Sequence, residues 1–246
     1  MRGESVLLFL LLAFAIATPS FLAITPDTPA IASLVLLMLG SYAPTIAAIV
    51  VLRVQGIPRE RMDFKKRLLR WQVQPSWYAI AIFLPSGTWL LAFAHCVLLG
   101  HPQGAQPLAF LYLPLIIISS FGEETGWRGF LLPRLFARTG PVSSSLLLGL
   151  IWGIFHVPLF WRDPTSLILI LIFSLAMSII LTWLFIGSGE SVLLTTLTHA
   201  VFITWGQVLL PISIYVFAIA IALISLWALF LVMRFGPCLT NLSATE

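Results

Sequence analysis

Five ionisable residues stand inside long apolar stretches of this sequence: Glu123, Glu124, Arg128, His156 and His199. A charged side chain at the centre of a membrane-spanning helix costs about 2.5–3.5 kcal/mol on insertion scales, so each of these residues needs a role. A carboxylate and two imidazoles can together deprotonate water, protonate a leaving amine and stabilise an oxyanion. The set therefore predicts hydrolytic chemistry at membrane depth.

The two glutamates cannot share one role, because adjacent residues of an α-helix point about 100° apart. Arg128 follows Glu124 by four residues, which places both on one helix face, where a carboxylate–guanidinium pair neutralises both charges. We expect Glu124 and Arg128 to form a structural pair. Glu123 then remains free to meet groups from other helices.

The two histidines lie on separate apolar segments. His156 is in the second half of LLLGLIWGIFHVPLFW, and His199 is in the middle of ESVLLTTLTHAVFITWG. A single buried histidine is more often a structural residue than a catalyst. Three helices that each bring one ionisable group to a similar depth favour a common site instead, so we expect Glu123, His156 and His199 to converge.

The helices that must position these residues are predicted from composition. With 60% hydrophobic residues, 9% charged residues and a mean hydropathy of +1.05, the chain lacks the polar surface of a water-soluble globule. About 20 apolar residues are needed for each crossing of the bilayer. The sequence predicts one all-α membrane domain, residues 1–246, with eight spans near 5–25, 31–53, 76–99, 108–127, 144–161, 165–186, 190–209 and 211–233.

Charge placement predicts the orientation of these spans. With both termini in the cytoplasm, every one of the 13 Lys and Arg residues except Arg162 falls on the cytoplasmic side or at its membrane edge. The pI near 9.5 therefore indicates topology and contact with anionic lipid, and does not indicate nucleic-acid binding. Residues 54–77 form either an amphipathic helix on the inner surface or a simple basic loop. Residues 1–18 have features of a cleavable signal peptide, but a retained first helix is favoured.

Three motifs give the chain a family resemblance. GEETGWRGFLLPRL, residues 122–135, resembles the Glu-Glu-x-x-x-Arg motif of the CPBP family, which includes CAAX prenyl proteases of the Rce type and bacterial Abi proteins. Trp152 to His156 is similar to the family's second motif, an aromatic residue followed four positions later by His. The third motif, His-x-x-x-Asn, is matched only at His199, since position 203 is Ile and Thr204 is the nearest polar substitute. The resemblance covers residues 110–205, which we take as the catalytic core.

The resemblance implies an intramembrane glutamic endopeptidase whose site opens toward the cytoplasm. Glu123 with His156 would activate water, Glu124 and Arg128 would support that geometry, and His199 would stabilise the oxyanion. Thr204 and Trp152 would support the substrate or the oxyanion. No cofactor is implied, although a metal ion is not excluded. The expected partners are the bilayer of a prokaryotic plasma membrane and a membrane-associated protein or peptide, including a prenylated CAAX-type substrate; the sequence predicts no oligomeric state.

Two alternatives remain open at this point. One is a metal-dependent peptidase, because Glu and His also bind transition metals, although no HExxH motif occurs in the chain. The other is a catalytically weak or inactive Abi-like membrane protein with an immunity or scaffold role. Ile203 supports this second alternative, because loss of one oxyanion donor typically lowers the rate by about 10²–10³.

Overall fold

The computed structural model describes residues 2–100, 106–209 and 214–240, and these residues form helices and no strands. Eight helical segments of this part of the chain are long and apolar enough to cross a membrane, as predicted. The chain is therefore an all-α, multi-pass membrane protein. Its helices are α1 (Arg2–Leu22), α2 (Ala30–Gln55), α3 (Pro58–Leu68), α4 (Pro75–Leu98), α5 (Leu113–Glu124), α6 (Leu132–Thr139), α7 (Pro141–Phe160), α8 (Pro164–Gly187), α9 (Val192–Leu209) and α10 (Ile214–Phe235).

The fourth span is more complex than the sequence predicted. It begins with the 3₁₀-helix η1 (Pro107–Tyr112), continues through α5 and the π-helix η2 (Thr125–Leu131), and ends with α6. The predicted boundary near residue 127 therefore falls inside a helical segment that extends from Pro107 to Thr139. A π-helix uses i→i+5 hydrogen bonds and occurs most often at functional sites. Here it begins directly after the two glutamates.

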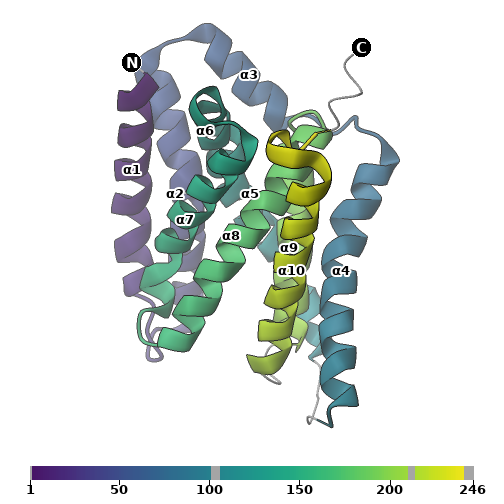
Figure 1. Ribbon diagram of the computed structural model, residues 1–246. Helices are drawn as coiled ribbons and strands as arrows, with labels where there is room; N and C mark the ends of the chain where they lie inside the picture. The colour runs from purple at the N-terminus through teal and green to yellow at the C-terminus, as the bar shows by residue number, and fades with distance from the viewer. Residues whose placement is uncertain (1, 101–105, 210–213, 241–246) are drawn as a thin grey trace.

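The two ends of the helix bundle differ in charge. Figure 1 shows that α1 begins and α10 ends at the same end, where α3 and α6 also lie. We call this the basic end, because every Lys and Arg except Arg128 and Arg162 lies in or next to the helix termini found there. The opposite end carries Arg162 together with Asp27 and Asp163.

Residues 54–77 contain the short helix α3, in agreement with the amphipathic interpretation of that segment. Phe64 is its buried residue, and its charged residues form ion pairs across the basic end. Arg67 pairs with Glu190 at 2.6 Å, and Glu60 pairs with Arg134 of α6. These pairs fix α3 across the ends of the spans that hold the ionisable residues.

Small residues let α2 and α7 approach their neighbours closely. A Cβ atom added to Gly126 of η2 would lie 2.3 Å from the Cβ of Pro44 in α2, and one added to Gly149 of α7 would lie 2.8 Å from the carbonyl oxygen of Ser174 in α8. Real Cβ atoms do not approach so closely, so only glycine fits at these crossings. Helix association in membranes depends on this kind of close packing.

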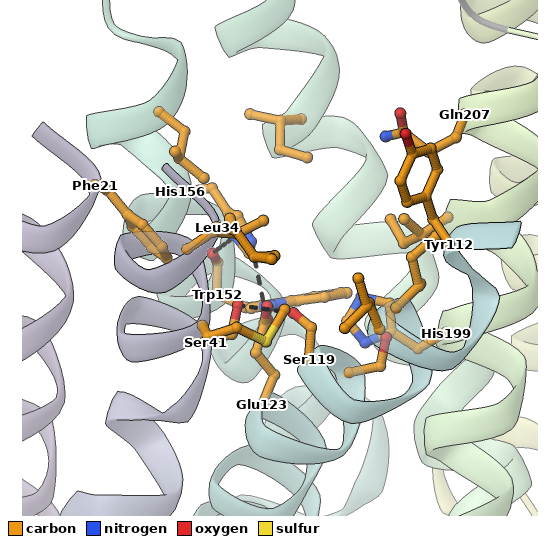
Figure 2. Close-up of a pocket in the computed structure, with 18 of the residues that line it drawn as sticks. Phe21, Leu34, Ser41, Tyr112, Ser119, Glu123, Trp152, His156, His199 and Gln207 are labelled. Carbon is orange, nitrogen blue, oxygen red and sulfur yellow. Dashed lines mark hydrogen bonds and ion pairs between the residues drawn. The ribbon is translucent and has the colours of Figure 1, made fainter. Parts of the chain in front are cut away.

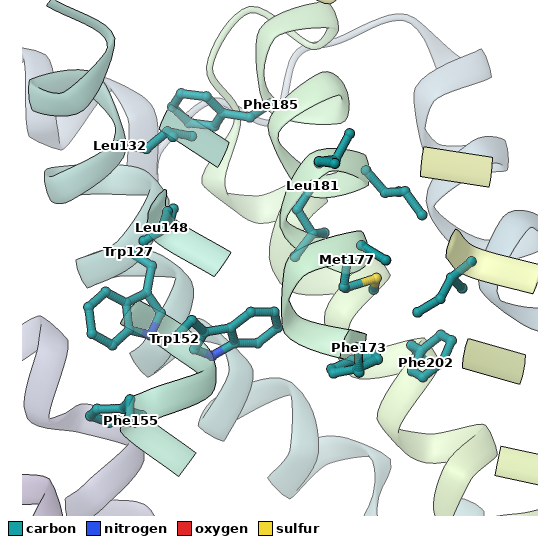
Figure 3. Packing of buried hydrophobic residues seen from close by; sticks show 14 of the residues in the cluster. Trp127, Leu132, Leu148, Trp152, Phe155, Phe173, Met177, Leu181, Phe185 and Phe202 are labelled. Carbon is teal, nitrogen blue, oxygen red and sulfur yellow. The ribbon is translucent and has the colours of Figure 1, made fainter. Parts of the chain in front are cut away.

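The buried centre of the bundle is rich in aromatic side chains. Figure 3 shows Trp127 and Phe155 on one side of Trp152, with Phe173 and Phe202 on the other. All five are buried, and their rings meet edge to face or tilted at centroid separations of 5.0–5.8 Å. Such rings lose little freedom on packing, so they hold the helices of the site in a fixed arrangement.

Gly126→Ala tests the crossing of α2 over η2. The added methyl group would collide with the Pro44 backbone, so we expect a loss of about 1–3 kcal/mol of stability, as is typical of overpacked cores. Gly87→Ala in α4 is the matched control, because its methyl group would meet nothing within 4 Å. Thermal unfolding of the two purified variants in detergent measures the difference. Equal melting temperatures would show that the crossing tolerates the methyl group.

Candidate active site

The Glu123 carboxylate is held in place by a second helix. Its Oε2 atom accepts a hydrogen bond of 2.7 Å from the indole Nε1–H of Trp152 in α7. The side chain is 7% exposed and lines a cavity, so it remains reachable by a small molecule. Glu123 therefore meets a group from another helix, as its position beside the Glu124 face predicted.

His156 presents its second ring nitrogen to Glu123. Its Nδ1 atom lies 2.8 Å from the backbone oxygen of Trp152, and because a carbonyl only accepts, Nδ1 carries the hydrogen. In the neutral ring Nε2 then holds a lone pair, and it lies 3.8 Å from Oε2 of Glu123. Two acceptors that face one another across this distance need a shared hydrogen donor. A water molecule or a proton between them meets that need.

Glu124 and Arg128 form the expected ion pair, with Nη1 and Oε1 2.8 Å apart and both side chains fully buried. Arg128 belongs to the π-helix η2, whose coil is wider than that of an α-helix, and Glu124 precedes it. The two side chains nevertheless remain close enough to pair. Sequence reasoning missed a further partner: Nδ1 of His199 lies 3.1 Å from the same Oε1 atom. A carboxylate accepts, so Nδ1 of His199 carries a hydrogen, and Nε2 is the atom left for the cavity that His199 lines.

Trp152 contacts four residues of the site, namely Glu123, His156, His199 and Arg128. Its indole N–H binds Glu123, its backbone oxygen binds His156, and its ring lies 5.1 Å from that of His199, measured between centroids. The guanidinium carbon of Arg128 lies 4.7 Å from the centroid of the Trp152 ring, within the range of a cation–π contact. Trp152 therefore positions the ionisable groups. The sequence had suggested for it a role in supporting the substrate or the oxyanion.

The site forms the polar floor of an otherwise apolar cavity of about 390 Å³, shown in Figure 2. The cavity walls come from the halves of α2, α5, α7, α8 and α9 that lie toward the opposite end of the bundle. Tyr112 precedes α5, Phe160 ends α7, and Gln207 lies two residues before the end of α9. The cavity therefore extends away from the basic end. A cytoplasmic basic end and a site open to the cytoplasm were both expected, and this geometry does not allow both.

The third motif has no polar residue at the cavity wall where the family has Asn. Ile203 lines the cavity, whereas the hydroxyl of Thr204 is buried and donates to the backbone oxygen of Ala200 at 2.8 Å. Thr204 is not among the residues that line the cavity. Its hydrogen is thus used within its own helix.

Sequence reasoning did not select two serines of the cavity. Ser119 lies one helical turn before Glu123, and its hydroxyl donates to Oγ of Ser41 in α2 at 2.9 Å. Within the described part of the chain, the hydroxyl hydrogen of Ser41 has no acceptor of its own. The spacing of Ser119 from Glu123 was visible in the sequence, but nothing local connected Ser41 to this site.

The metal-dependent alternative requires several His, Cys, Asp or Glu side chains grouped around one point. Among the described residues, no group of three or more His, Cys, Asp and Glu side chains is arranged to hold a metal ion. We therefore derive no step through a metal.

Comparison with known proteins finds similarity over the segment that holds the site. Residues 105–205 match the family described as Type II CAAX prenyl endopeptidase Rce1-like. A protein of Methanococcus maripaludis named CAAX prenyl protease 2 is 24% identical over 205 residues, which cover 73% of this chain and 74% of the relative. The matched region contains Glu123, Glu124, Arg128, His156 and His199. Residues 105–205 are thus similar to the Rce1-like family of type II CAAX prenyl endopeptidases, and this similarity, together with that of the relative, supports a peptidase.

Proposed function

We propose that the chain is an intramembrane endopeptidase in which Glu123 and His156 activate water against peptide bonds of membrane-associated proteins. The observation that carries this proposal is the 3.8 Å separation between Oε2 of Glu123 and Nε2 of His156 at the floor of the cavity. A water molecule between these acceptors donates one hydrogen to each. Its oxygen then points its lone pairs into the cavity, where a substrate carbonyl would lie.

In the first step, the water oxygen attacks the carbonyl carbon while Glu123 takes the proton. The C–O bond forms, the carbonyl π electrons move to oxygen, and a tetrahedral oxyanion results. Trp152 keeps the Glu123 carboxylate oriented through its N–H. In the second step the C–N bond breaks, the oxyanion collapses to a carboxyl group, and Glu123 passes the proton that it took from water to the leaving amine.

His199 and Ser41 are the proposed donors to the oxyanion. Because Nδ1–H of His199 is directed to Glu124, donation from Nε2 requires the doubly protonated ring. Two carboxylates, one guanidinium and one imidazolium then sum to zero charge, which suits a buried cluster. Ser41 supplies the second donor, because Ser119 satisfies its oxygen and leaves its hydrogen available.

The apolar cavity walls favour an apolar stretch of a membrane-associated protein as substrate. A cavity of about 390 Å³ accommodates a few side chains, and its acidic and basic groups, Glu123, His156 and His199, lie together where the scissile bond would be cut. We place the protein in the plasma membrane of a prokaryotic cell. The archaeal source of the relative supports that location.

Glu123→Gln tests the general base, because glutamine keeps the shape of glutamate but cannot take a proton. We expect cleavage of a membrane-anchored reporter to fall by about 10²–10⁴-fold. The matched control is Glu190→Gln at the basic end, where the half-exposed carboxylate pairs with Arg67 outside the cavity. Rates are measured with purified proteins in liposomes, at equal protein content. Undiminished cleavage by Glu123→Gln would exclude this mechanism.

Ser41→Ala tests the second oxyanion donor, and Thr204→Val tests the alternative that the sequence suggested. We expect Ser41→Ala to lower kcat by about 10²-fold with little change in KM, because the lost hydrogen bond forms fully only in the transition state. Thr204→Val is expected to change kcat by less than about threefold, because the Thr204 hydroxyl serves its own helix. A larger loss in Thr204→Val than in Ser41→Ala would reverse the assignment.

Ile203→Asn places an amide donor on the cavity wall where the family has one. The double variant with Ser41→Ala is expected to have a kcat at least tenfold higher than that of Ser41→Ala alone. A purely structural effect of Ser41→Ala would not be rescued by a new donor on α9. Absence of rescue, together with a lowered melting temperature for Ser41→Ala, would assign Ser41 to packing.

A further inference from the structure

The basic residues of the bundle and its cavity lie at different ends of the molecule. Different residues determine the two features. In the membrane proteins of cells, Lys and Arg in short loops remain on the cytoplasmic side. Here they gather at the basic end, and the loop between α7 and α8 at the opposite end has only Arg162. This distribution predicts that the basic end is cytoplasmic.

The cavity approaches the surface at the opposite end. His156 lies four residues before Phe160, where α7 ends, and Leu34 lies four residues after Ala30, where α2 begins. Both helix ends belong to the opposite end of the bundle in Figure 1. In Figure 2, Gln207 and Tyr112 lie on the far side of the cavity from Glu123. An extended chain can therefore reach Glu123 from this end along the cavity walls.

The route from the basic end is closed by packed residues. Every residue of η2 is buried, and η2 lies between Glu123 and that end. The ring of Phe64 in α3 packs against Gly129, and Nη1 of Arg67 donates to the Gly129 oxygen at 3.5 Å. The ion pair of Arg67 with Glu190 holds α3 over this segment. A substrate on the basic side would have to displace α3 and unfold η2.

The chemistry of the cavity restricts its occupant further. No Lys or Arg among the described residues lines it, and its polar wall residues away from the floor, Tyr112 and Gln207, are neutral. Away from the floor, a free C-terminal carboxylate would lie in apolar surroundings without a cationic partner, which disfavours its binding there. An internal peptide bond within an apolar segment carries no such charge.

We propose that the basic end faces the cytoplasm and that the cavity receives apolar segments of membrane proteins from the non-cytoplasmic face, for cleavage at an internal bond. This inference rests on the proposed peptidase function for its substrate, and on loop charge alone for its orientation. It differs from the orientation that the family resemblance implied, in which the site opens toward the cytoplasm.

Orientation is tested with two single-cysteine variants in a background with Cys96→Ala and Cys238→Ser. Arg162→Cys and Lys66→Cys each replace one exposed cation, at the opposite end and the basic end respectively. A membrane-impermeant maleimide applied to intact cells is expected to label Arg162→Cys at least tenfold more than Lys66→Cys. After permeabilisation, both should label equally. Preferential labelling of Lys66→Cys in intact cells would overturn the inference.

Substrate side is tested with two reporters that carry the same apolar span and the same cleavage window. One places the window at the non-cytoplasmic end of the span and the other at the cytoplasmic end. We expect the chain to cut the reporter with the non-cytoplasmic window at least tenfold faster than the other. The Glu123→Gln variant serves as the blank, the inactive control, for each reporter. Equal cutting, or faster cutting of the cytoplasmic window, would overturn the inference while leaving the peptidase intact. If neither reporter is cut above the blank, the proposed function fails, and the labelling still decides the orientation.

Discussion

The structure depends on the burial of Glu124 and Arg128 as a pair. Each charge alone would cost several kcal/mol at this depth, and their contact at 2.8 Å with no exposure offsets that cost only because both are fixed in place. The pair joins the end of α5 to the π-helix η2, and Glu124 extends the contact to His199 of α9. His199 is thus positioned by Glu124, the buried and paired carboxylate that directly follows Glu123 in the chain.

Trp152 links this buried pair to the part of the site that reaches the cavity. Its ring faces Arg128 and His199, while its N–H and backbone oxygen hold Glu123 and His156. A tryptophan is suited to this position because its large rigid ring loses little freedom on burial and its single donor must find an acceptor. The two adjacent glutamates therefore have different surroundings. Glu124 is buried and paired with Arg128, whereas Glu123 lies at the edge of the cavity.

Much of this arrangement could be read from the sequence, because the membrane imposes simple rules. Apolar length predicted the eight spans, and the cost of buried charge identified Glu123, Glu124 and Arg128 as residues with roles. The contact between His199 and Glu124 could not be predicted, because it joins residues 75 positions apart through the crossing of α5 and α9. The π-helix η2 also has no local signal in the sequence, and neither does the close approach of its Gly126 to Pro44 of α2. Ile203 and Thr204 show the same limit, because the sequence does not reveal that Ile203 lines the cavity while the Thr204 hydroxyl donates to the backbone oxygen of Ala200.

The orientation of such a bundle is decided by a different part of the chain from the part that decides its chemistry. Insertion responds to Lys and Arg near the ends of the spans, whereas the site is built from residues facing the bundle interior. Arg128 is the one basic residue of the site, and because it is buried and paired it does not act as a loop charge. A few cations in the loops are therefore enough to turn the cavity toward either face of the membrane without altering any distance among Glu123, His156 and His199. The distances among the residues of the site therefore do not by themselves determine the side of the membrane from which a substrate comes.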